Sequence, residues 1–203
     1  MSRSTHQEHR DDIGSKLGMW LFIFTELLLF GGLFIVYAVY RYLNPTAFHL
    51  ASQELDVTIG TVNTVILLIS SATIAMSISA IQKKDRRMSL ILVGTTIVLA
   101  LVFLVNKYFE WGEKFEHGLF PGSQFLEQLG TGDVMFFGLY FFMTGLHAFH
   151  ILVGVAVLGF MFYYLVKGKI THDNHQLLEN GGLYWHLVDL IWIFLFPLFY
   201  LIA

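Results

Sequence analysis

The sequence predicts an all-α integral membrane protein, a bundle of five transmembrane helices. Hydrophobic residues make up 56% of the 203 positions and charged residues only 13%, and the mean hydropathy is +0.64. The apolar residues also fall into runs of roughly 20 or more, the length that a helix needs to cross about 30 Å of hydrocarbon. Membrane barrels would instead show alternating segments of about ten residues. Both observations therefore favour helices that span a membrane.

The chain begins with a polar segment, residues 1–16, which lacks the apolar core of a secretory signal. We interpret this segment as a short flexible cytoplasmic tail that precedes a single domain over residues 17–203. The fourth apolar run is about 33 residues and so roughly 50 Å long, which requires tilt or extension beyond the lipid. Pro197 is expected to bend the last run, because it frees the carbonyl of Ile193. The predicted spans are residues 17–40, 57–81, 88–105, 134–166 and 182–202.

The longest loop, residues 107–132, is expected to form a surface lid that turns at Pro121 and Gly122.

The charges of the loops predict the orientation of the chain in the membrane. Nine of the 12 lysine and arginine residues lie in the tail, the second loop or the fourth loop. Because basic residues accumulate on the side that is not translocated, the amino terminus should be cytoplasmic and the carboxyl terminus outside. The bases predicted on the outer side are Arg41, Lys107 and Lys114.

Ionisable side chains at membrane depth are expensive, so each needs a partner or a purpose. The last span carries Tyr184, Trp185, His186 and Asp189. His186 and Asp189 are three residues apart and share a helical face, which we interpret as a structural polar pair, since no nucleophile stands at a matching depth. Glu26 lies near the middle of the first span. It is expected either to be neutral and hydrogen-bonded to another helix or to act as a proton-responsive or lipid-headgroup partner.

His147 and His150 also share one helical face, and His186 should lie near them if the fourth and fifth spans pack as antiparallel neighbours. Three histidines suggest a metal or haem. However, a haem with two histidine ligands needs them from opposite sides, so interhelical hydrogen bonds are the expected use. Cysteine is absent, which excludes disulfides and cysteine-ligated metal centres. We therefore expect no catalytic, cofactor-binding or metal-binding residue in this chain.

Four ordered blocks resemble one family. Residues 16–26 (KLGMWLFIFTE), with FGG at 30–32, resemble the first shared helix of subunit III of haem-copper cytochrome c oxidases, where a glutamate lies within the membrane. The second block, residues 67–75 after Asn63 and Thr64, resembles the next helix. Residues 144–154 (TGLHAFHILVG) and 184–192 (YWHLVDLIW) resemble the family's His-containing stretch and its closing signature. Glu110 stands where relatives keep an acidic residue.

This resemblance implies a non-redox accessory subunit in a bacterial inner membrane. Haem and copper would belong to partner subunits, as would oxygen reduction and proton pumping. This chain would pack against catalytic subunit I, stabilise it, hold phospholipid and support proton uptake. Long relatives have seven spans, and this chain begins at the equivalent of the third, so a neighbouring subunit would supply the missing pair. A nucleic-acid partner is not expected.

Three alternatives stay open. Five-span relatives also occur in quinol oxidases and alongside nitric-oxide reductases, although Glu26 and the sequence Tyr-Trp-His at 184–186 favour the cytochrome c branch. From another class, a small proton-coupled transporter could use Glu26, His147, His150, His186 and Asp189 as a relay. The absence of internal repeats and broken helices argues against such a transporter.

Overall fold

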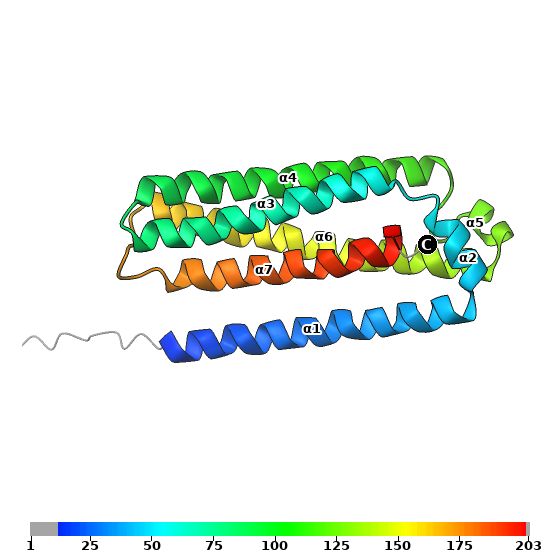
Figure 1. The fold of residues 1–203 in the computed structure, drawn as a ribbon, viewed down its shortest axis with the longest axis horizontal. Helices are drawn as coiled ribbons and strands as arrows, with labels where there is room; N and C mark the ends of the chain where they lie inside the picture. The colour runs from blue at the N-terminus through cyan, green and yellow to red at the C-terminus, as the bar shows by residue number, and fades with distance from the viewer. Residues whose placement is uncertain (1–11, 202–203) are drawn as a thin grey trace, which may run out of the picture.

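A computed structural model describes residues 12–201, and the regular structure within them is helical apart from one isolated bridge between Thr171 and Asn174. Figure 1 shows long helices running side by side, with two short helices at one end. The elements are α1 (Asp12–Leu43), α2 (Pro45–Ser52), α3 (Val57–Gln82), α4 (Arg86–Glu116), α5 (Gln124–Leu129), α6 (Thr131–Val166), α7 (Gln176–Phe196) and the π-helical segment η1 (Pro197–Leu201).

The all-helical prediction is confirmed. Within the described residues, five helical spans are long and apolar enough to cross a membrane; four contain a predicted apolar run in full, and the fifth covers the last run up to Leu201. The helices exceed the predicted spans at most ends. The predicted tail is one correction, because residues 12–16 form the first turns of α1, where Lys16 pairs with Glu179 at 3.7 Å. The rest of that tail, residues 1–11, lies outside the described residues.

The predicted loop over residues 107–132 is also corrected. Helix α4 continues to Glu116, eleven residues beyond the predicted end of the span, and three polar side chains of this extension face the bundle. Lys107, Glu110 and Lys114 are all buried. Polarity in this stretch therefore marks contacts between helices, and only the part after Glu116 forms a connection.

The short helices α2 and α5 were not predicted, and both lie at the end of the bundle where α1 ends (Figure 1). Pro45 begins α2, where its fixed φ suits the first helical turn. Ser123 caps α5 by accepting a hydrogen bond from the Phe125 amide at 3.2 Å. Helix α2 packs on α6 so closely that a Cβ at Gly132 would lie 2.5 Å from that of Ala47.

The predicted break at Pro197 appears as a change of helix type. Regular α-helix ends at Phe196, and the next five residues form η1. The Tyr37 hydroxyl of α1 donates a 2.7 Å hydrogen bond to the Leu198 carbonyl, which ties η1 to α1. A carbonyl near the break thus gains a side-chain partner, as helices interrupted by proline at membrane depth require.

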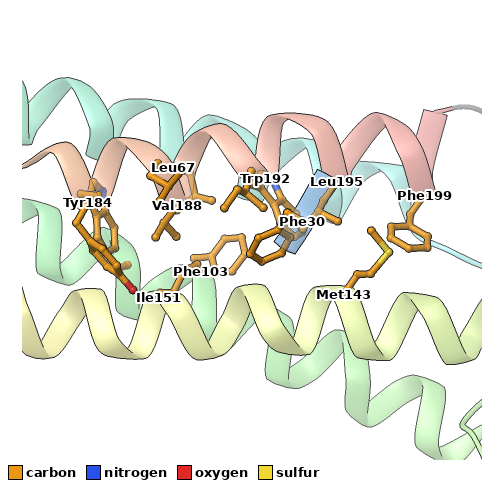
Figure 2. Packing of buried hydrophobic residues seen from close by; sticks show 14 of the residues in the cluster. Phe30, Leu67, Phe103, Met143, Ile151, Tyr184, Val188, Trp192, Leu195 and Phe199 are labelled. Carbon is orange, nitrogen blue, oxygen red and sulfur yellow. The ribbon is translucent and has the colours of Figure 1, made fainter. Parts of the chain in front are cut away.

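The core lies between α6, α7, α3 and α4, and Figure 2 shows its large side chains meeting there. Trp192 stands edge-on to Phe103 with ring centroids 4.9 Å apart. Trp185 packs against Gly154, where a Cβ would lie 2.7 Å from the indole, so glycine is needed for this close approach. Helix α1 is peripheral and packs against α6, α7 and α2.

Candidate functional site

The predicted Glu26 lies between two helices, facing His150. Its Oε2 is 3.0 Å from His150 Nε2, which joins α1 to α6 across 124 residues of sequence. Both side chains are largely enclosed, with 15% and 10% of their surfaces exposed. The Tyr184 hydroxyl of α7 donates to the His150 carbonyl at 2.9 Å, and Phe30 packs edge-on against the imidazole. Three helices therefore meet at this pair.

The second nitrogen of His150 determines how protons are shared. Nδ1 lies 2.8 Å from the Leu146 carbonyl, which can only accept a hydrogen bond, so Nδ1 carries a hydrogen. Nε2 then either accepts a hydrogen bond from a protonated Glu26 or donates its own hydrogen to an ionised one. In both cases the pair shares one proton and has no net charge. This neutrality explains how two ionisable groups persist at this depth.

A second group of polar residues joins α4, α6 and η1, and all of its members are buried. Lys107 Nζ donates to Glu110 Oε2 at 3.0 Å, to the Tyr200 hydroxyl at 2.8 Å and to the Tyr140 hydroxyl at 3.2 Å. Both hydroxyls also donate to Glu110 Oε1, Tyr140 at 2.7 Å. The lysine and glutamate side chains are only 3% and 1% exposed. We call these four residues the lysine–glutamate cluster.

Trp192 forms one wall of the lysine–glutamate cluster, with its ring centroid 5.0 Å from Lys107 Nζ.

The sequence pointed to Glu110, but Lys107 was interpreted as a base in a loop and both tyrosines were overlooked. The available signal was the spacing of three residues between Lys107 and Glu110, which places opposite charges on one helical face. Lys114, another predicted loop base, is buried and donates to the Glu54 carbonyl.

The interhelical hydrogen bonds predicted for His147 are not found. His147 has no exposed surface, and neither ring nitrogen has a hydrogen-bond partner among residues 12–201. Its ring stacks on Trp192 with centroids 5.1 Å apart and meets the edge of Phe103. The side chain thus packs as an aromatic ring in the core.

The predicted pair of His186 and Asp189 is also corrected. His186 Nδ1 lies 2.7 Å from the Ser71 hydroxyl of α3, while Asp189 has no hydrogen-bonded partner among the described residues, although Ser71 is its polar neighbour. Trp185 Nε1 donates to the Ser70 hydroxyl at 3.0 Å. The closing signature of α7 therefore contacts α3 through residues 70 and 71.

The three histidines of the predicted spans have different surroundings. His150 faces Glu26, His186 faces Ser71, and His147 is enclosed by rings. In the part of the chain that the structure describes, no three histidine or acidic side chains are grouped as a metal site would require. These buried side chains join helices and hold protons at fixed positions.

Comparisons with known proteins agree with this architecture. A family model described as cytochrome c oxidase subunit III matches residues 3–203. The chain is 30% identical over 196 residues to a haem-copper oxidase subunit I+III of Aeropyrum pernix, covering 92% of this chain and 22% of that longer one. It is 28% identical over 198 residues to a cytochrome c oxidase subunit 3 of Synechocystis, covering 97% and 79% of the two chains.

A third relative is a probable quinol oxidase subunit 3 of Staphylococcus haemolyticus. It is 27% identical over 189 residues, which cover 93% of this chain and 89% of that one. The similarity thus extends over nearly the whole chain, and it includes relatives named for two different electron donors.

Proposed function

The chain belongs to the cytochrome c oxidase subunit III family, and we propose that it is the redox-inactive third subunit of a proton-pumping haem-copper oxidase that uses cytochrome c. The match over residues 3–203 carries this proposal. The Aeropyrum relative, whose name joins subunits I and III in one chain, supports catalytic subunit I as the direct partner. In this role the chain stabilises subunit I, retains phospholipid and helps keep proton uptake fast.

The buried side chains support a role without redox chemistry in this chain. Haem iron would need an accessible imidazole nitrogen on an open face. His147 is enclosed by Trp192 and Phe103, while His150 and His186 each face a side chain on another helix. These residues do not fit a haem or copper centre, so we assign oxygen reduction to the partner subunits.

A quinol oxidase is the second candidate, and the name of the Staphylococcus relative favours keeping it. A subunit associated with a nitric-oxide reductase is a third, more distant possibility within the family. The proton-coupled transporter has less support, because its candidate relay residues form no continuous chain: Glu26 and His150 contact each other, but His186 contacts Ser71 and His147 packs on Trp192.

Purification with its natural partners tests the proposal. A tagged copy of the chain, extracted in mild detergent, is expected to bring haem-bearing polypeptides with it and to show oxygen uptake with reduced cytochrome c. The chain expressed alone should show no stoichiometric Soret band in its absorption spectrum. Uptake with quinol but not with cytochrome c would select the second candidate. Recovery without any haem protein would contradict membership of an oxidase complex.

We also propose that residues 17–203 form one transmembrane domain in a bacterial inner membrane, with the amino terminus cytoplasmic and the carboxyl terminus outside. The buried positions of Lys107 and Lys114 support this orientation, because among residues 12–201 they leave the half-buried Arg41 as the one lysine or arginine that is not buried at the end of the bundle predicted to be outside. Bases exposed at the opposite end include Lys83 and Lys84.

Cysteine labelling tests this orientation on a background without native cysteine. Glu116→Cys and Lys84→Cys both place a thiol at an exposed position. Glu116 is the last residue of α4, whereas Lys84 lies in the turn before the first residue of α4, so the two thiols are at opposite ends of the bundle. An impermeant maleimide added outside intact cells should label the first and not the second. A permeant maleimide should label both, which controls for accessibility. The reverse pattern would invert the topology.

A further inference from the structure

A groove opens at the end of the bundle where α2 and α5 stand (Figure 1), between these two short helices and the first turns of α6. We propose that this groove is a docking surface for another subunit of the oxidase complex, and that it receives a lysine side chain flanked by apolar residues. This contact presupposes the proposed membership of such a complex. It is separate from the polar contacts within the bundle, because its charged side chains are not buried.

The groove lies beyond the hydrocarbon layer of the proposed arrangement in the membrane. Helices α4 and α6 have 31 and 36 residues, so they are about 46 and 54 Å long, whereas the hydrocarbon is about 30 Å thick. Glu116, the last residue of α4, stands about 16 Å past the predicted end of its span. The connection that follows, with α5, therefore faces water and the extramembrane parts of other chains.

The groove has a volume of about 540 Å³, and its lining is mainly apolar. Ala51, Leu119 and Phe137 are buried beneath it. Phe125 and Leu129 of α5 also line it, but 51% and 50% of their surfaces are exposed. Large apolar side chains that are grouped in one groove and exposed outside the lipid indicate a contact with another protein.

Two carboxylates in the lining lack a cation. Glu54 follows the end of α2, and Asp133 lies in the first turn of α6. Within residues 12–201, no ion pair includes either side chain. Lys114, which is buried nearby, donates to the carbonyl of Glu54. The positive end of the α6 dipole favours Asp133, but Glu54 stands at the negative end of α2, where an acid is unfavourable and a cation is stabilised.

The surroundings of the groove are also acidic. Of the lysines and arginines at this end, Lys107 and Lys114 are buried and Arg41 is half-buried. The acidic side chains at this end that are not buried are Glu54, Asp56, Glu113, Glu116, Glu127 and Asp133. The negative charge therefore complements a basic partner, and it would repel an acidic one.

The positions of the acceptors favour lysine over arginine. The two carboxylates come from different elements, and the end of α2 adds partial negative charge beside them. A compact ammonium has three donors that can meet acceptors from several directions, whereas the planar guanidinium fork best matches a single carboxylate. The methylene groups of a lysine would also cover the apolar lining.

Carbodiimide cross-linking in the purified complex tests the contact. The reagent joins a carboxylate to a lysine amine that touches it, and peptide mass spectrometry locates the bond. Glu54 or Asp133 is expected to be joined to a lysine of a different chain. Glu54→Gln combined with Asp133→Asn should lose this cross-link. Glu113→Gln combined with Glu127→Gln, at exposed positions outside the groove, is the matched control and should keep it. Absence of any cross-link from Glu54 and Asp133 to another chain would overturn the proposal.

Salt dependence measures what the two charges contribute. With the complex held through a tag on a haem-bearing chain, the double substitution in the groove should raise the rate at which this chain dissociates by about tenfold at about 50 mM salt, and much less at about 500 mM, where charges are screened. The control pair should match the parent at both concentrations. Equal dissociation of the parent and the groove variant at low salt would also overturn the contact. A parent chain that brings no haem protein with it would instead refute the proposed function, whereas an intact complex with neither effect would refute the groove contact alone.

Discussion

Replacing Lys107 with methionine is expected to destabilise the protein by about 3–5 kcal/mol, the usual cost of removing one member of a buried ion pair. The substitution keeps most of the length of the side chain but leaves Glu110 without its cation in an enclosed site. The hydroxyls of Tyr140 and Tyr200 lose the same donor. Denaturant unfolding in detergent, followed by tryptophan fluorescence, measures the loss.

A double-mutant cycle separates the ion pair from general packing. Glu110→Gln alone should also be strongly destabilising, but Lys107→Met combined with Glu110→Gln should cost clearly less than the sum of the two, because no unpaired charge remains. Lys83→Met, at an exposed position, is the matched control and should have little effect. Strict additivity in the cycle would show that the two charges do not stabilise each other.

The lysine–glutamate cluster shows where prediction from the sequence ends. Hydropathy located every long helix, because the length and apolarity of a span are local properties. The end of α4 was missed, since a lysine in a loop and a lysine buried against tyrosines look the same in a one-dimensional profile. Tyr200 lies 93 residues from Lys107, and no periodicity within a helix connects them.

The histidines show the same limit for the candidate site. Helical periodicity predicted that His147 and His150 share one helical face, but it could not say which helix faces each one. The two imidazoles are only three residues apart on α6, yet that of His150 meets Glu26 and that of His147 meets Trp192. Glu26 could be selected as a residue with an interhelical contact, because a carboxyl group near the middle of a span requires a partner, whichever helix supplies it.

Helix α1 is peripheral, and the Glu26 contact is the polar contact nearest its middle. It packs against the bundle along one face, and apolar side chains on its other face, such as Trp20, Phe24 and Leu28, are about 60% exposed. Its polar contacts with other elements include Ser15 and Lys16 at one end, Glu26 near the middle and Tyr37 towards the other end. The central contact is therefore expected to control how firmly α1 stays on α6 and α7.

Glu26→Gln is expected to leave assembly with the catalytic subunit nearly intact, whereas Glu26→Ala should weaken assembly or lipid retention. The glutamine amide can donate to Nε2 of His150, as a protonated Glu26 would. Alanine leaves that nitrogen buried without a partner, at a cost of about 1–3 kcal/mol. Because the redox centres are assigned to another subunit, initial oxygen uptake should fall only modestly in either variant, while activity should decline faster over repeated turnover, most of all in Glu26→Ala.

Oxygen uptake followed over time in the reconstituted complex measures both quantities. Leu28→Ala, a truncation at an exposed position two residues further along α1, is the control and should match the parent. Infrared spectroscopy should show a protonated-carboxyl band that disappears in Glu26→Gln if the shared proton sits on the glutamate. If it sits on His150 instead, glutamine breaks an ion pair and should behave like alanine. Immediate and complete loss of activity in a fully assembled Glu26→Gln complex would place the glutamate in the chemistry itself and refute the accessory role.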